Sequence, residues 1–193
     1  MLGLKLPTDP RWVNIVEKNI DEILTDHAYC EQKAASTAIS LIVSFPEYTD
    51  LTQEMIALSR EEMGHFKMVH DRIIARGQTL GRDRKDLYVV ELMKFFPKGG
   101  SRTNQLVHRL LYAALIEARS CERFRLLSEE LQDKELAEFY HKLMVSEAGH
   151  YTMFLKFARK YGNLEEVNQK WQDLLDYEAQ IMKNLGKNET VHG

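Results

Sequence analysis

Cysteine, proline and glycine are all scarce in this chain of 193 residues, which contains two, four and ten of them. The two cysteines, Cys30 and Cys121, form no CxxC pair and no disulfide framework, so the sequence holds no rubredoxin-type or iron–sulfur cysteine motif. We interpret both as buried thiols. Because proline and glycine are the residues that interrupt helices, their scarcity favours long helices.

Long apolar runs are also missing. No run reaches the roughly 18 residues that a membrane-crossing helix needs, and the opening residues lack the apolar core of a signal peptide. We therefore expect no membrane partner and a cytoplasmic location. The sequence has no flavin or nicotinamide fingerprint either. With 44% hydrophobic and 28% charged residues, the composition is that of a globular protein with a substantial core.

Charge is distributed unevenly, although the net charge is only −3. The segment 72–109 contains nine lysines and arginines and three acidic residues, which gives it a net charge of +6. A basic segment in an otherwise acidic chain indicates an anionic partner, or else a solvated loop rich in lysine and arginine. The composition alone leaves both interpretations open.

Apolar residues recur at helical spacing through five segments. We predict helices over residues 12–45, 48–76, 103–130, 133–161 and 164–185, and a disordered tail over 186–193. The first two helices and the next two are joined by tight connections, which is typical of antiparallel hairpins. A crossover of about 25 residues separates the hairpins. The fold class predicted for residues 1–193 is therefore a single all-α domain, a ferritin-like four-helix bundle with a long crossover and an additional C-terminal helix.

Two ExxH motifs carry the strongest chemical signal. Glu62 and His65 lie in the second predicted helix, and Glu147 and His150 lie in the fourth. Residues three apart share one helix face, so each motif directs a carboxylate and an imidazole to one point. Both motifs fall within apolar stripes that face inward, and the stripes of the other two helices contain Glu31 and Glu117. The predicted stripe of helix 48–76 consists of Leu51, Met55, Leu58, Glu62, His65, Val69 and Ile73.

The four glutamates repeat at matched spacing, because Glu31 precedes Glu62 by 31 residues and Glu117 precedes Glu147 by 30. Buried carboxylates need compensating charge, and two divalent ions balance four of them. Mixed oxygen and nitrogen ligands suit iron or manganese better than structural zinc. We therefore predict a two-metal centre held by six catalytic, metal-ligating residues: Glu31, Glu62, His65, Glu117, Glu147 and His150. His27, one turn before Glu31, could support that ligand or be an ordinary core histidine, and we favour the second interpretation.

Four stretches of the sequence resemble one family. They are 26–35 (DHAYCEQKAA) on the first helix, 116–124 (IEARSCERF) on the third, and the two ExxH segments 61–66 and 146–151. The first two in particular are similar to the signatures of the tRNA 2-methylthio-isopentenyladenosine hydroxylase (MiaE) family, and the resemblance spans nearly the whole chain. It implies a diiron monooxygenase that uses O₂ to hydroxylate the isopentenyl side chain of a modified adenosine in tRNA, with the six residues as iron ligands.

The resemblance gives the basic crossover a role in tRNA binding. The candidate contacts are Arg82, Arg84, Lys85, Lys94, Lys98, Arg102, Arg119 and Arg123, although Arg119 and Arg123 could instead pair with acids. An external reductase or ferredoxin is the expected electron donor, and the oligomeric state is left open. The alternatives are a ferritin-like ferroxidase or other iron-handling protein, a manganese catalase or rubrerythrin-like peroxidase, and a non-enzymatic helical protein.

Overall fold

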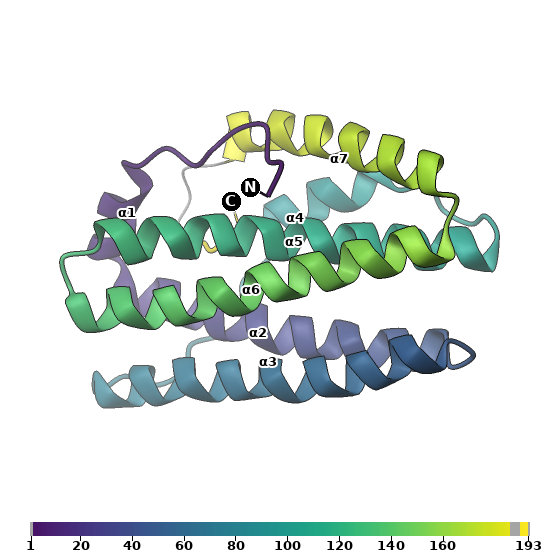
Figure 1. Cartoon of the computed structure of the whole chain (residues 1–193). Helices are drawn as coiled ribbons and strands as arrows, with labels where there is room; N and C mark the ends of the chain where they lie inside the picture. The colour runs from purple at the N-terminus through teal and green to yellow at the C-terminus, as the bar shows by residue number, and fades with distance from the viewer. Residues whose placement is uncertain (1, 186–189, 193) are drawn as a thin grey trace. The chain divides into compact units, whose positions relative to one another are not determined.

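The structure is a computed structural model that describes residues 2–185 and 190–192 (Figure 1). All regular secondary structure in these residues is helical, which confirms the all-α prediction. The described chain divides into two compact units. We call the first the α5–α6 unit, with residues 2–17, 86–185 and 192, and the second the α2–α3 unit, with residues 18–85 and 190–191. The prediction of a single domain stays a prediction.

The α2–α3 unit is built on an antiparallel hairpin of α2 (Ile20–Ser44) and α3 (Thr49–Ala75), visible in Figure 1. After α3, Gly77 adopts a positive φ of 73°, a conformation that ends helices and suits glycine. The chain then runs beside α2, where the Tyr29 hydroxyl donates to the Gly81 carbonyl at 2.9 Å. Lys33 pairs with Asp83 at 2.6 Å, so the start of the crossover is fastened to α2.

The α5–α6 unit contains a second antiparallel hairpin, formed by α5 (Arg102–Glu130) and α6 (Lys134–Tyr161) (Figure 1). Ser101 and Asp133 cap these helices by accepting the backbone N–H of Asn104 and Leu136, as N-cap residues do. The unit also contains α7 (Leu164–Leu185), which packs against α4 (Leu87–Leu92), and the short helix η1 (Met93–Phe95). Because several elements cover α5, it is buried on most of its circumference.

The predicted helix over 12–45 is wrong in one respect. The structure has two helices, α1 (Trp12–Lys18) and α2, separated at Asn19, whose backbone angles are −135° and 36°. Two acidic residues, Asp21 and Glu22, occupy the first turn of α2, where the helix dipole favours negative charge. Periodicity gave no sign of the break, because the apolar positions keep helical spacing on both sides of Asn19.

The other predicted helix boundaries agree with the structure to within one residue. The predicted disordered tail 186–193 falls partly outside the described residues, at 186–189 and 193. Of the remainder, Val191 and His192 are buried. The Val191 N–H donates to Asp26 at 2.7 Å, and His192 stacks on Tyr88 and lies 3.1 Å from Asp86. Residues 190–192 are therefore an ordered part of the fold.

None of the helices among the described residues combines the length and the hydropathy needed to cross a bilayer.

Candidate functional site

Three predicted ligands meet within the α2–α3 unit. Glu31 lies on α2, and Glu62 and His65 lie one turn apart on α3; each has a ligand atom within 4.8 Å of the others. His65 Nδ1 is 3.2 Å from Glu62 Oε2 and 3.8 Å from Glu31 Oε2. All three are at most 8% exposed. The predicted inward stripe of α3 is confirmed, because its buried residues are Leu51, Met55, Leu58, Glu62, His65, Val69 and Ile73.

Hydrogen bonds within this cluster shift the pKa values of Glu31 and His65. Burial alone would raise the pKa of Glu31, but hydrogen bonds from His27 and His65 outweigh it and hold that pKa well below its usual value. Burial alone would lower the pKa of His65, but hydrogen bonds to Glu31 and Glu62 outweigh it and raise the pKa to about 10. Without a metal ion, the cluster at neutral pH is therefore anionic Glu31 beside a protonated His65.

His27 is more than an ordinary core histidine. Its ring is fully buried, and Nε2 lies 2.6 Å from Glu31 Oε1. This contact is possible because His27 and Glu31 are four residues apart on α2 and so share one helix face. The imidazole therefore fixes the orientation of the Glu31 carboxylate, in the way that neighbours of metal ligands commonly do.

We expect His27→Phe to weaken metal binding by roughly ten- to one-hundredfold, because Glu31 loses the group that orients it. The measurement is an anaerobic Fe²⁺ titration of wild type and variant. His27→Gln, which retains a polar group at this position, is the matched variant and is expected to recover part of the affinity. Equal affinity for wild type and His27→Phe would mean that Glu31 needs no support from His27.

The other three predicted ligands meet within the α5–α6 unit. Glu117 lies on α5, and Glu147 and His150 lie one turn apart on α6, again with ligand atoms within 4.8 Å of one another. His150 Nδ1 is 3.9 Å from Glu117 Oε2, and the three residues are at most 6% exposed. Each unit thus has the same set of groups, with a glutamate on its first long helix and an ExxH pair on its second.

The donor set of each cluster fits a divalent metal ion. Two carboxylates and one imidazole lie close together and away from water, and hard oxygen with borderline nitrogen ligands is the combination that iron and manganese accept. A buried carboxylate pair without a cation is costly. Each cluster therefore has the chemistry of a metal-binding site.

Over residues 2–193, the sequence matches the profile of the family described as tRNA-(MS2IO6A)-hydroxylase (MiaE). The chain belongs to the MiaE family.

Two curated proteins, each named tRNA 2-(methylsulfanyl)-N(6)-isopentenyladenosine(37) hydroxylase, support the membership. The one from Pseudomonas putida is 39% identical over 164 residues, which is 85% of this chain and 78% of the relative. The one from Salmonella typhimurium is 26% identical, across 98% of this chain and 87% of the relative. Since these MiaE relatives are named as hydroxylases, the present chain is a member of an enzyme family.

A solved structure is also similar, described as protein 43 with aldehyde deformylating oxygenase activity from Synechococcus. It is 30% identical, with a TM-score of 0.91 over 98% of this chain and 95% of that one. This likeness confirms the predicted ferritin-like fold class of the MiaE-family chain.

Six of the eight predicted tRNA contacts of this MiaE-family chain are exposed: Arg82, Arg84, Lys85, Lys94, Lys98 and Arg102. Some of them take part in surface ion pairs, such as Arg84 with Glu22 at 3.3 Å and Lys94 with Glu91 at 2.6 Å. Such exposed pairs are worth little, so these side chains can exchange a carboxylate for a phosphate at small cost.

Arg119 and Arg123 are placed differently, because neither has any exposed surface. Arg119 donates to Glu178 at 2.6 Å and to Glu122 at 3.0 Å. The guanidinium of Arg123 lies 4.3 Å from the centre of the Trp12 ring. Of the two roles left open by the sequence, the structure supports pairing with acids for Arg119, whereas Arg123 donates to the Thr8 hydroxyl at 3.3 Å. A buried guanidinium offers no surface to a tRNA phosphate.

The network around Arg119 is the feature that sequence reasoning missed. It ties the N-terminal segment to α5 and α7, since Thr8 donates its N–H and hydroxyl to Glu122 and Tyr88 donates to Glu178. One signal in the sequence pointed to it. Glu178 falls on the apolar face of the predicted helix 164–185, and a glutamate there needs a buried cation.

Proposed function

We propose that this protein is an O₂-dependent diiron monooxygenase that hydroxylates the isopentenyl side chain of 2-methylthio-isopentenyladenosine in tRNA. The observation that carries the proposal is the repeated buried set of one glutamate and one ExxH pair, in a chain that belongs to the MiaE family. The two curated relatives are named for this hydroxylation. Because its substrate is tRNA, we place the enzyme in the cytoplasm.

The six residues of the two clusters are proposed to be the ligands of two iron ions. Four carboxylates supply four negative charges, which two ferrous ions balance. Iron, when bound, supplies the electrons that activate O₂ for attack on an unactivated C–H bond. The protein's own contribution is to hold the carboxylates in place, to keep water away by burial, and to orient Glu31 through His27.

Iron binding by this centre is expected to depend on pH. A histidine ligand must be neutral, whereas metal-free His65 carries a proton at pH 7 because its pKa is raised to about 10. Binding of Fe²⁺ therefore releases that proton, so the apparent affinity for Fe²⁺ rises with pH. The rise is about tenfold per pH unit for each proton released, and it ends when the pH reaches the pKa of His65. Anaerobic Fe²⁺ titrations about one pH unit apart measure this slope. A flat affinity would show that His65 is already neutral without iron.

The exposed residues Arg82, Arg84, Lys85, Lys94, Lys98 and Arg102 are proposed to contact the tRNA backbone. Electrons are proposed to come from an external reductase or ferredoxin, because the sequence contains no flavin or nicotinamide fingerprint and no cysteine pairs. The purified protein should then fail to turn over with NADPH alone and succeed with a chemical reductant system.

The test is a nucleoside assay. The iron-loaded protein is incubated with O₂, a reductant system and tRNA that carries the isopentenyl modification. The tRNA is then digested, and the masses of its nucleosides are measured by mass spectrometry. We expect the modified adenosine to gain one oxygen atom, and tRNA without the isopentenyl group to stay unchanged. No gain, with two irons bound and the substrate verified, would overturn the proposal and favour an iron-oxidising protein.

A further inference from the structure

A groove opens in the α5–α6 unit where the crossover meets α5. Its volume is about 710 Å³, within the range of about 300–1,000 Å³ typical of small-molecule sites. The groove combines apolar and cationic side chains, among them Met93, Lys94, Phe96, Lys98, His108 and Arg109. We call it the Phe96 groove. Among the described residues that line it there is no aspartate or glutamate.

Aromatic side chains form the wall of the Phe96 groove. Phe96 is half-buried, with its ring centre 5.4 Å from that of His108 and 6.4 Å from that of Tyr112. Burial and the nearby Lys170 ammonium lower the pKa of His108, so the imidazole is neutral at pH 7 and behaves as an aromatic ring. Half-exposed rings of this kind are the surfaces on which unpaired bases stack.

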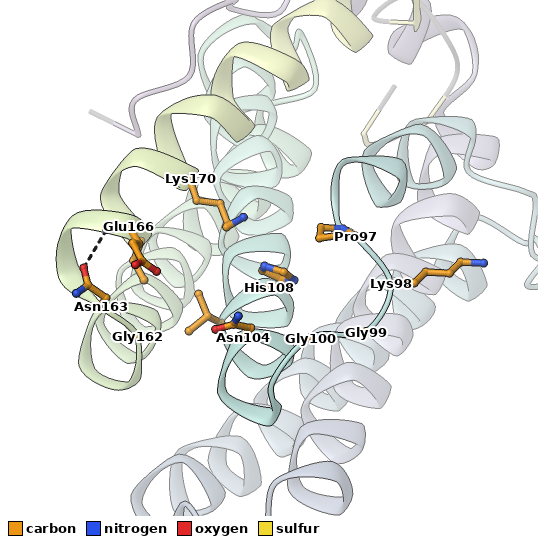
Figure 2. A pocket seen from close by; sticks show the side chains of 12 residues that line it. Pro97, Lys98, Gly99, Gly100, Asn104, His108, Gly162, Asn163, Glu166 and Lys170 are labelled. Carbon is orange, nitrogen blue, oxygen red and sulfur yellow. Dashed lines mark hydrogen bonds between the residues drawn. The ribbon is translucent and has the colours of Figure 1, made fainter.

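Cationic side chains line the Phe96 groove. Lys98 is exposed, and no carboxylate within the described part of the chain pairs with it. Figure 2 shows its ammonium directed away from the neighbouring hollow of about 290 Å³, which contains Glu166 and Lys170. Lys98 is part of the lining of that hollow, but its ammonium lies on the side away from Glu166 (Figure 2). Arg109 adds a second positive charge to the groove, and Lys94 lines it as well, paired with Glu91 at 2.6 Å.

The turn behind Lys98 is fixed in place. Gly99 and Gly100 have φ angles of +86° and +92°, which side chains other than glycine rarely tolerate. The Gln105 amide donates to the Gly100 carbonyl at 3.0 Å, and Ser101 caps α5 by accepting the Asn104 N–H. The groove is thus organised before any ligand arrives, which lowers the entropic cost of binding.

We propose that the Phe96 groove binds unpaired nucleotides of the RNA substrate, with a base stacked on Phe96 and His108 and a flanking phosphate on Lys98. The inference rests on the proposed function, and it specifies how the substrate is held. Adenosine 37 lies beside the anticodon, in a single-stranded loop whose neighbouring bases are available for stacking. A paired stem keeps its bases inside the helix, where Phe96 cannot reach them.

The experiment measures binding of an isopentenylated anticodon stem-loop RNA and of a fully paired duplex of the same composition. Phe96→Leu removes the aromatic face and keeps an apolar side chain; we expect it to weaken stem-loop binding between about five- and one-hundredfold. Phe96→Tyr restores the face and should bind nearly as wild type. Leu164→Ala, at an apolar residue that is 56% exposed on α7, is the matched control and should not weaken binding.

Charge is tested in the same assay. Lys98→Glu should weaken stem-loop binding about tenfold, and should lower the slope of log affinity against log salt by about 0.7, the value for one phosphate contact on a single strand. Lys98→Arg should restore both. The matched control is Lys156→Glu on the exposed side of α6, which should leave the slope unchanged.

The outcomes separate the two proposals. If wild type hydroxylates the tRNA but the Phe96 and Lys98 variants bind the stem-loop as wild type does, the groove inference is overturned and the proposed function stands. If those variants bind RNA normally but accept electrons more slowly from a reductase, the groove is a protein docking site and the inference again fails. If wild type binds the stem-loop through the groove but does not hydroxylate it, the reaction alone is wrong.

Discussion

Replacing Glu62 with alanine is expected to remove iron binding and hydroxylation together. Glu62 is fully buried on α3, and its carboxylate lies beside His65 and within reach of Glu31. The variant deletes one of the four carboxylates on which the proposed centre depends. Since losing a group that merely supports a ligand costs ten- to one-hundredfold, losing a ligand should cost at least roughly one-hundredfold in metal affinity, with activity falling to background.

An exposed glutamate of the same helix supplies the matched control. Glu54 lies on α3 two turns before Glu62 and is exposed, so Glu54→Ala changes the same charge on the solvated face. We expect Glu54→Ala to retain two irons per chain and wild-type product formation. Iron content and product mass are measured on both variants in parallel.

Stability distinguishes a lost ligand from a damaged fold. Glu62→Gln retains the shape of the side chain and removes its charge. In the metal-free variant His65 keeps Glu31 as a partner, so the fold should stay intact and the metal-free Glu62→Gln protein should unfold close to the urea concentration of the metal-free wild type. Normal activity in either Glu62 variant would remove Glu62 from the ligand set.

Replacing Arg119 with methionine is expected to destabilise the protein by about 3–5 kcal/mol, the typical cost of removing one partner from a buried ion pair. Arg119 is the cation between Glu178 and Glu122, and it also donates to the Leu6 carbonyl. Its loss leaves two carboxylates buried without that cation. The measurement is urea unfolding of the metal-free protein, which keeps iron binding out of the comparison.

Arg125→Met is the control for this experiment. Arg125 lies on the same helix and pairs with Glu129 at 3.3 Å, but both side chains are about half exposed, so its loss should cost about 1 kcal/mol or less. Combining Arg119→Met with Glu178→Leu should recover part of the lost stability, because the pair is then replaced by apolar groups. If Arg119→Met weakened tRNA binding and left the unfolding midpoint unchanged, Arg119 would be a substrate contact after all.

The sequence by itself determined the parts of this protein that depend on local spacing. Helix 164–185 was predicted at its exact limits, and the buried stripe of α3 residue by residue, because a helix repeats every 3.6 residues and its inner face can be counted along the chain. The same counting placed Glu31, Glu62 and Glu147 on inner faces, where the structure also has them. An acidic residue on an apolar stripe can be recognised from the sequence alone, without knowing which residue it contacts in the fold.

Only the tertiary structure decided which polar groups pair across long distances in the chain. Arg119 and Glu178 are 59 residues apart, and Val191 reaches Asp26 over 165. An exposed arginine and a buried one look alike in a sequence, since burial depends on which segments come to cover the helix. That is why Arg119 could be assigned to tRNA from its neighbours in the sequence, and why the N-terminal segment and α7 place it in the core instead.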